Sequence, residues 1–541
     1  MRFLPDQRSE LRFAALVTFV LVVSAALPEL VGRILAAPSG ALPFIGSDTG
    51  VYYSYIEQVR QGHWLFRDVF TTEVQAHRFL NVSWLAVGLL ARITQLGPEW
   101  IFPLSRLLSI LVAVAALVFA GRTFLDDARS RRMFLLLAAF GAGWGAWWVV
   151  GRSLLGLPPE GLNLPIDLWV PEATLLLSAL SSPHFVLSLA ALVTVISAGY
   201  RFARTFSWRW LIFAAAVFGL LAQFHPYYIP VVLAVSGVGW LTLTPTGKHF
   251  WMLLCGIAVL VAAGVIGALP YGLLSLSDVT TLLRNGLNQT PMPRLSIALI
   301  SAGAFLPLAL VALWRGRTAR MPAWRFLAAW LIVHSAFVYA PIPWQRKMTE
   351  GLLVPFALLA APELLRWWDA LRAMRIGEAL DPIKRLVATA LFLLIFSASV
   401  AMNLLSTSVW FTRPFPIWIT ADDRAAMSWI SATLPEDAVI VATAERANGI
   451  AAMTARTVYA GHWAETTGIE SKLGALVWLA TQARDDAARH RFLTRAGITH
   501  VYIGPLEREV WKWEPSGPGF REVYRAGQVA IFAVQEYAGS R

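Results

Sequence analysis

The stretch from Gly46 to Arg78, GSDTGVYYSYIEQVRQGHWLFRDVFTTEVQAHR, follows directly after the first long apolar segment of the chain. It is polar, aromatic and charged, whereas most of the sequence is hydrophobic. Ordering a long polar excursion costs conformational entropy, so a chain that has just crossed a bilayer normally returns through a short loop. The length of this stretch therefore indicates a functional loop. Its carboxylates, of which Asp48 comes first, are the best candidates in the chain for proton chemistry beside a membrane.

The composition indicates a polytopic membrane protein. Of the 541 residues, 57% are hydrophobic and 14% are charged, whereas about a quarter is charged in soluble proteins. The net charge of +12 lies largely in short loops between apolar segments, as the positive-inside rule produces, so no nucleic acid is expected as a partner. Cys255 is the only cysteine, which excludes disulfides and cysteine-based metal sites within the chain.

The first apolar run, Phe13 to Val31, is long enough to span a bilayer, because about 20 helical residues cover a hydrocarbon core of roughly 30 Å. Arg8 and Arg12 precede it, so we expect a retained span with a cytoplasmic N-terminus. A cleaved signal peptide is the alternative, because Ala36-Ala37 resembles a small-residue cleavage site. The length of the apolar run argues against cleavage.

The apolar stretch from Phe79 to Leu96 decides the topology. If it crossed the membrane, the later basic loops, including those at Arg122 and Arg201, would lie outside and break the positive-inside rule. The stretch also contains polar residues, which suit a helix that lies in the interface or re-enters it. We therefore expect a first outer loop over residues 32–100.

The predicted fold class is an α-helical polytopic membrane protein with about 11 spans. Proline interrupts two of the apolar segments, at Pro183 and Pro226, where helices should end or kink. The expected spans lie at 13–31, 101–120, 133–150, within 175–200, twice within 210–244, and at 251–273, 295–314, 326–340, 351–365 and 386–411. From residue 412 to 541 strands and helices alternate, so we predict an extracytoplasmic α/β domain there and a membrane domain over 1–411.

This order of features resembles the GT-C superfamily of integral-membrane glycosyltransferases. The stretches that resemble its bacterial dolichyl-phosphate-mannose mannosyltransferase-like members are SDTGVYYSYIEQVRQG, DLWVPEA, SPHF, HPYY, PWQRKMTEGLLVP and VYAGHWAETT. The resemblance implies inverting transfer of a mannose-like sugar from a polyprenyl-phosphate donor to a glycan, lipid or protein acceptor on the outer face of the membrane. It also implies that an acidic residue of the first outer loop is the base, and the positional match is Asp48. Thr49 stands where protein O-mannosyltransferases have a second acidic residue, which argues against a protein acceptor.

The chemistry of a lipid-linked sugar leads to the same residues. The lipid phosphate is the leaving group, so the protein must supply a carboxylate for the acceptor hydroxyl and cations for the departing phosphate. Asp48 is the candidate carboxylate, and its structural alternative is a helix N-cap. Arg346 and Lys347 are the candidate cations, and ordinary headgroup contact is their alternative. His225 and Tyr227, at a proline break, are further candidates for the donor phosphate.

Other polar residues of the outer loops are candidates for the acceptor or for a second acidic locus, although each has a simpler structural interpretation. They are Glu73, His77, Asp167, Glu172 and His184. We also expect His462, Trp463 and Glu465 to let the C-terminal domain cover the site. No outer segment shows a recognised metal-ligand spacing, so no metal is predicted, and the polyprenyl-phosphate sugar is a substrate rather than a cofactor.

A transporter or flippase of a lipid-linked glycan is the main alternative function. The spans lack buried charge pairs and detectable inverted repeats, which argues against it. A membrane-anchored scaffold is a third possibility, but a single span would suffice for that role. The expected location is the bacterial inner membrane, with the N-terminus in the cytoplasm and the C-terminal domain in the periplasm.

We predict that the stretch from Phe79 to Leu96 does not cross the membrane. A reporter that is active only in the cytoplasm should be active when fused near Asp127, because basic loops stay inside. A periplasmic reporter should be active near Glu436. A silent cytoplasmic reporter at Asp127, with an active periplasmic reporter at the same place, would contradict this topology.

Overall fold

The computed structural model describes residues 5–73, 75–157, 164–244, 246–278, 281–282, 286–319, 322–373, 381–412, 418–483 and 485–536. Contacts between residues divide the chain into two units. The first unit contains Met1–Pro28, Pro103–Leu269 and Gln289–Ser406. The second unit contains Glu29–Phe102, Pro270–Asn288 and Thr407–Arg541.

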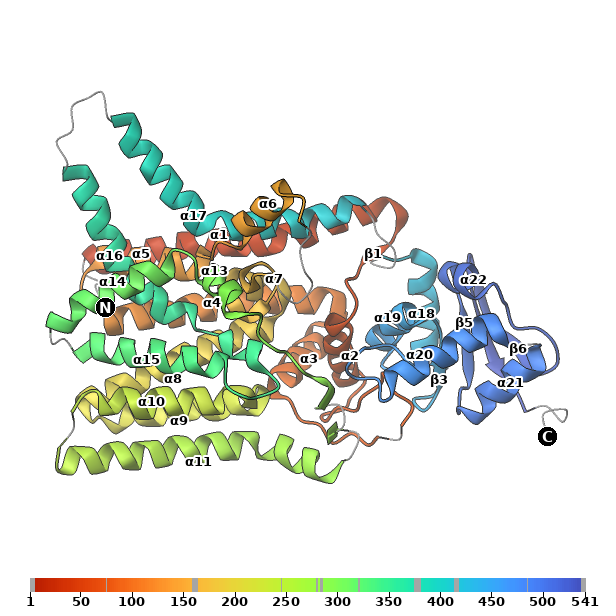
Figure 1. The fold of residues 1–541 in the computed structure, drawn as a ribbon. Helices are drawn as coiled ribbons and strands as arrows, with labels where there is room; N and C mark the ends of the chain where they lie inside the picture. Colours follow the sequence, from red (N-terminus) through yellow and green to blue (C-terminus); the bar gives the residue numbers. More distant parts are fainter. Residues whose placement is uncertain are drawn as a thin grey trace. The chain divides into compact units, whose positions relative to one another are not determined.

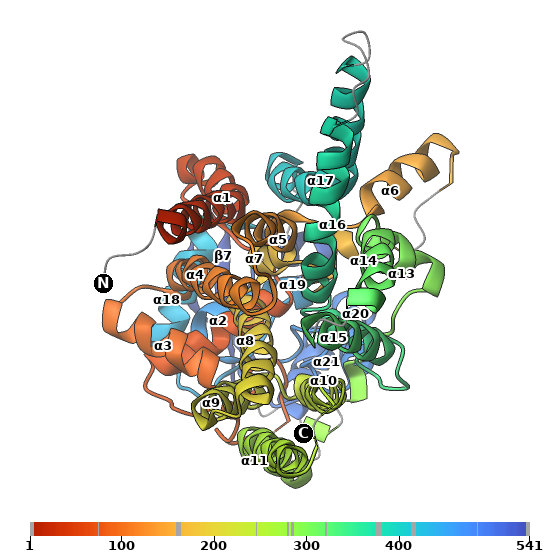
Figure 2. The same ribbon diagram turned by 90° about the vertical axis from the view of Figure 1, so that its left-hand side faces the viewer.

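Helices long and apolar enough to cross a membrane dominate the chain (Figure 1). In the described part these are α1 (Pro5–Ala36), α4 (Pro98–Phe124), α8 (Pro183–Thr205), α11 (Lys248–Ser277), α16 (Leu353–Ala373) and α17 (Asp381–Thr412). Two bent pairs qualify only together, α5 (Ala128–Phe140) with α6 (Gly145–Leu154), and α13 (Leu295–Ala302) with α14 (Phe305–Ala319). Shorter apolar helices of the described part are α3 (Val82–Thr94), α9 (Trp208–Phe224), α10 (Ile229–Leu241) and α15 (Pro322–Val338). Within the first unit, Figure 2 shows α4, α8, α9, α10 and α15 almost end-on, so these helices run roughly parallel to one another.

Every expected span contains a helix, but two of them are not single helices. The segment predicted at 133–150 is bent by 48° between α5 and α6, and the one predicted at 295–314 is bent by 78° between α13 and α14. The two breaks meet within the first unit, where the Trp144 N–H donates to Ile300 O at 2.9 Å. A Cβ on Gly143 would collide with Ser301 O, so glycine permits this close approach.

The predicted proline breaks are confirmed. Pro183 occupies the first turn of α8, directly after the short helix α7 (Leu175–Ser181). Pro226 opens the 3-10 turn η5 (Pro226–Tyr228), which separates α9 from α10. Proline is accepted at both places because the first turn of a helix leaves its N–H groups unpaired in any case.

The C-terminal part of the second unit has the predicted α/β character. One sheet has the order β4 (Thr457–Val458), β3 (Val439–Val441), β5 (His500–Ile503), β7 (Val529–Val534) and β6 (Phe520–Ala526), of which the first three are parallel. The helices are α18 (Ala421–Thr433), α19 (Ala444–Thr454), α20 (Ile469–Val477), α21 (Asp486–Arg495) and α22 (Pro505–Trp511). Strand β6 is an edge strand, in which charged and partly exposed residues replace an apolar face.

The first loop folds onto this α/β part. It contributes α2 (Asp48–Arg60), α3 (Val82–Thr94) and β1 (Leu42–Pro43), which pairs with β2 (Trp418–Ile419). Helix α2 packs against both α3 and α19. Buried side chains of α2, including Ile56 and Val59, belong to one core with Ile450 of α19. The loop is therefore a structured part of the second unit, and the N-terminal residue of α2 is held in a defined place.

Helix α3 covers most of the stretch on which the predicted topology depends. It is only 13 residues long, and Asn81 caps it by accepting hydrogen bonds from the N–H groups of Ser83 and Trp84. A helix of this length rises about 20 Å, less than a hydrocarbon core of roughly 30 Å. These features agree with an interfacial helix, and the topology itself stays a prediction.

Candidate functional site

The structure places Asp48 at the start of α2 and brings His462 to it. Asp48 Oδ1 lies 3.0 Å from His462 Nε2, and the His462 side chain is 2% exposed while that of Asp48 is 59% exposed. Ser47, directly before it, has a φ of 62°, which is uncommon for a residue other than glycine. Such backbone strain persists only where the surroundings enforce it, and it gathers at functional sites.

The backbone around His462 fixes its tautomer. Its Nδ1 accepts hydrogen bonds from the N–H groups of Ala464, at 3.2 Å, and Glu465, at 3.1 Å. The ring proton of the neutral imidazole is therefore on Nε2, which donates to Asp48. Thr466 Oγ1 accepts from the N–H groups of Gly461 and His462, both at 3.1 Å, and so holds this turn. The structure thus brings His462 into contact with the first loop, and the expected covering of the site by His462, Trp463 and Glu465 stays a prediction.

Asn448 of α19 joins the segments that carry Asp48 and His462. Its amide nitrogen donates to Ser47 O at 3.3 Å and to Gly461 O at 2.9 Å. A Cβ on Gly50 would collide with the Asn448 side chain, so glycine in the first turn of α2 permits the contact. Sequence analysis missed Asn448. The available signal was a polar Asn-Gly pair inside an otherwise good helix sequence, where neither residue is favoured by helix propensity.

Glu73 and His77, predicted near the acceptor, have other partners within the second unit. Glu73 Oε2 accepts from Lys472 Nζ at 2.8 Å and from the Thr71 hydroxyl. Burial raises the pKa of Glu73, but these hydrogen bonds outweigh burial and the net shift is downward. The His77 ring stacks on His63 at 4.0 Å between centroids. Glu73 thus links the loop to α20, whereas His77 packs within the loop, and their predicted role toward an acceptor stays a prediction.

The cations predicted for a donor phosphate both lie in the first unit, on the last of three 3-10 turns, and this turn contacts the other two. The turns are η4 (Pro171–Ala173), η5 and η6 (Gln345–Thr349). The Arg346 guanidinium lies 4.3 Å from the ring centre of Trp169, and Lys347 Nζ lies 4.3 Å from that of Tyr227. Arg346 Nε and Nη1 are buried and have no hydrogen-bond partner among the described residues. We call Arg346 and Lys347, together with the rings of Trp169 and Tyr227, the cationic cluster.

His184 and His225 lie next to the cationic cluster. Their rings meet edge to face at 4.8 Å, and Lys347 interacts electrostatically with both. Ser182 Oγ lies 2.6 Å from His184 Nδ1, and Ser188 Oγ lies 2.6 Å from His225 Nδ1. His184, predicted with the acidic or acceptor residues, thus lies beside the donor-phosphate candidates.

The two acids predicted as a second acidic locus occupy different environments. Glu172, on η4, interacts electrostatically with Arg346 and with the buried Glu350, which sequence analysis missed. Asp167 instead fills the break between α5 and α6, where its Oδ2 accepts the Gly145 N–H at 3.0 Å. Burial raises the pKa of Asp167 to about 7. Its placement indicates that Asp167 supports the bent helix.

Comparison with solved structures identifies the fold. The archaeal oligosaccharyltransferase AglB from Archaeoglobus fulgidus, in complex with an inhibitory peptide and a dolichol-phosphate, matches 91% of this chain and 70% of its own, with a TM-score of 0.52 and 12% identity. The arabinofuranosyltransferase AftD from Mycobacteria, in a mutant form, matches 96% of this chain and 41% of its own, with a TM-score of 0.54 and 15% identity. No protein-family model and no curated protein sequence matches the chain.

The chain therefore has the GT-C fold of integral-membrane glycosyltransferases. This confirms the predicted fold class, a polytopic helical membrane protein with a small α/β part near its C-terminus. The narrower resemblance to mannosyltransferase-like members stays a prediction.

We predict that Asp167→Asn weakens the pH dependence of stability. Between its unfolded pKa of 3.8 and its native pKa of about 7, Asp167 binds a proton in the folded protein that the unfolded chain has lost. This contribution to the free energy of unfolding is full below the lower value and falls as the pH rises toward 7. The loss in melting temperature from pH 5 to pH 8, measured in detergent, should be smaller in Asp167→Asn than in wild type. Asp126→Asn, at an exposed carboxylate of the same unit, is the control and should match wild type.

Proposed function

We propose that the protein is an inverting glycosyltransferase that moves a sugar from a polyprenyl-phosphate donor to an acceptor hydroxyl at the outer face of the membrane. The observation that carries this proposal is the hydrogen bond between Asp48 and the buried His462. This hydrogen bond orients the largely exposed carboxylate of Asp48. Asp48 lies in the loop where the GT-C resemblance places the catalytic base. The fold shared with AglB, a protein solved with a dolichol-phosphate, supports a donor of the lipid-phosphate type.

In the proposed reaction Asp48 accepts the proton of the acceptor hydroxyl as that oxygen attacks the anomeric carbon of the sugar. The bond from the anomeric carbon to the phosphate oxygen breaks, and the phosphate leaves with the bonding electrons. Attack from the side opposite the leaving group inverts the anomeric carbon. His462 donates a hydrogen bond to the ionised form of Asp48, which favours that form and orients the carboxylate toward the acceptor. The exposure of the Asp48 side chain lets the proton pass on to water.

The cationic cluster is proposed to bind the donor phosphate. Arg346 presents two nitrogens, Nε and Nη1, with no hydrogen-bond partner among the described residues, and a guanidinium can hold two phosphate oxygens at once. Stacking on Trp169 fixes the plane of this group. Lys347, above Tyr227, would add a point charge that stabilises the phosphate as it leaves. The proposed base thus lies in the second unit, and the residues proposed to bind the phosphate lie in the first unit. Each assignment rests on contacts within its own unit.

The finer assignments rest on the sequence resemblance. We propose a mannose-like sugar and a glycan or lipid acceptor, because Thr49 replaces the second acid of protein O-mannosyltransferases. The proposed location is the bacterial inner membrane, with the transfer on its periplasmic side.

A reconstitution experiment separates this function from transport. Purified protein in vesicles that contain polyprenyl-phosphate-mannose should form a new glycosidic bond, detected by mass spectrometry of the lipid and glycan fractions. Movement of the donor across the vesicle membrane without a new bond would instead support a flippase. Comparing lipid-linked intermediates and surface glycans in cells with and without the gene would name the donor and the acceptor.

We predict that Asp48→Asn lowers turnover by about 10²–10⁴-fold, because the amide keeps the shape and loses the basic oxygen. His462→Gln should lower turnover by about 10–100-fold, because the carboxylate stays but is less well positioned. Asp485→Asn is a matched control in the same unit, since asparagine also caps a helix. Turnover near that of wild type in Asp48→Asn would move the base to another acid of the outer loops.

We predict opposite responses to charge-conserving changes in the cationic cluster. Arg346→Lys should lower donor-dependent turnover at least 10-fold, because an ammonium cannot replace the two-nitrogen contact of a guanidinium. Lys347→Arg should retain most of the activity, because the point charge is kept. Steady-state kinetics of the purified variants measures both. Wild-type kinetics in Arg346→Ala would exclude the assignment, and the exposed Arg294 would become the next candidate.

A further inference from the structure

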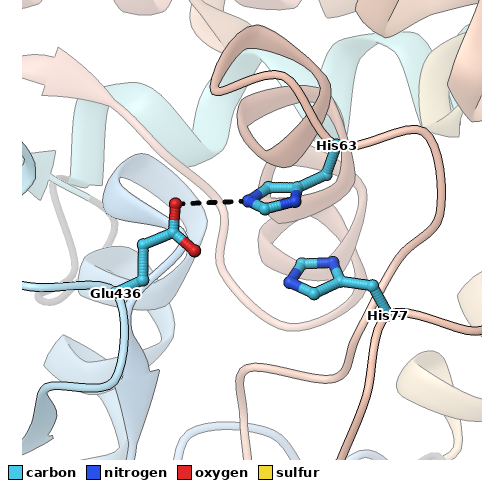
Figure 3. A group of neighbouring side chains, drawn as sticks. All are labelled: His63, His77 and Glu436. Carbon is cyan, nitrogen blue, oxygen red and sulfur yellow. Dashed lines mark hydrogen bonds and ion pairs between the residues drawn. The ribbon is translucent and has the colours of Figure 1, made fainter.

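His63, His77 and Glu436 form a second polar group within the second unit, made of other residues than those that hold Asp48 (Figure 3). Their possible ligand atoms all lie within 4.8 Å of one another. His63 Nε2 is 3.4 Å from Glu436 Oε1, and the two imidazole rings stack with an angle of 15° between their planes. Figure 3 shows one nitrogen of each ring on the side that faces the carboxylate.

The hydrogen bonds of His77 leave the correct nitrogen available for a metal. Its Nδ1 lies 3.0 Å from Leu65 O, and because a carbonyl only accepts, Nδ1 carries the proton. Nε2 then presents a lone pair. A backbone partner of this kind commonly orients metal-binding histidines.

The backbone holds the two histidines together. Phe66 and Phe79 form an antiparallel bridge, in which the Phe66 N–H donates to Phe79 O at 2.7 Å. This bridge joins the chain segments that carry His63 and His77. Arg67 Nη2 donates to the backbone oxygen of Glu436 at 2.6 Å and thereby fixes the turn on the other side. The arrangement is built from three segments and does not depend on one flexible side chain.

We propose that His63, His77 and Glu436 bind a divalent zinc ion, with water completing the coordination. Zinc bonds of 2.0–2.2 Å to imidazole nitrogen and carboxylate oxygen place neighbouring ligands of a tetrahedral site roughly 3.3 Å apart. The separation between His63 and Glu436 is 3.4 Å, close to that value. Magnesium and calcium prefer oxygen ligands, so two imidazoles select against them.

The ion would link the first loop to the C-terminal part of the second unit through ligands from both. Glu436 comes shortly before β3, whereas both histidines lie between α2 and α3. The inference goes beyond sugar transfer and does not require it. The sequence predicts no metal site because metal-ligand motifs are recognised by closely spaced ligands, whereas His63 and Glu436 are separated by 373 positions.

The test uses the purified full-length protein after treatment with a chelator. Titration with zinc chloride, followed by metal analysis of the washed protein, should give one zinc per wild-type chain and a higher melting temperature. His77→Gln and Glu436→Gln should each weaken zinc binding by at least 10-fold and abolish the thermal shift. His249→Gln, at an exposed histidine of the first unit, is the matched control and should bind as wild type does. Calcium chloride should give no shift.

Two comparisons make the test decisive. The chelator-treated Glu436→Gln protein should melt at the wild-type temperature, since this glutamate side chain is 55% exposed and its loss leaves the fold intact. Cobalt(II) in place of zinc should show visible absorption typical of a four-coordinate site in wild type and not in His77→Gln. Absence of bound zinc in wild type, or equal zinc binding by wild type and both site variants, would overturn the proposal.

Discussion

The second unit depends on the contact between α2 and α19, at which the amide of Asn448 bridges Ser47 and Gly461. The amide sits where Gly50 leaves room for it, so a side chain there would separate the helices. Because each bridged residue directly precedes a member of the Asp48–His462 pair, one helix–helix contact sets the position of both. The core formed by Ile56, Val59 and Ile450 supplies the apolar burial that holds this polar contact in place.

Such an arrangement explains why a polar loop of this length is retained. Its ordering entropy is offset by burial against the C-terminal part, by the β1–β2 pairing and by hydrogen bonds such as that of the Thr466 hydroxyl to Phe70 O at 2.7 Å. A strained residue, Ser47, then aims the first turn of α2. The position of Asp48 is thus set by many contacts between residues that are distant in sequence.

The first unit uses helix breaks to place polar groups. Prolines begin α8 and η5, and glycines open the bends between α5 and α6 and between α13 and α14. A break frees backbone groups that must find partners, since an unpaired group is costly away from water. Asp167 satisfies one of them, the N–H of Gly145. The aromatic rings of Trp169 and Tyr227 lie against the cations of the cationic cluster and help to stabilise them.

The sequence alone determined the membrane class, the positions of the helices and the α/β character of the C-terminal part, because hydropathy, proline breaks and strand–helix alternation are local signals. It also made Asp48 a candidate, and the role of that residue stays a prediction. It could not determine the bends at 141–144 and 303–304, since glycine is compatible with both a helix and a break. Only the tertiary structure decided that His462 meets Asp48, that Asn448 holds both segments, and that Glu436 joins His63 and His77. The residues of the first loop and their C-terminal partners lie hundreds of positions apart. Their approach depends on how the first loop packs into the C-terminal core, and local sequence patterns carry no information on such a long-range contact.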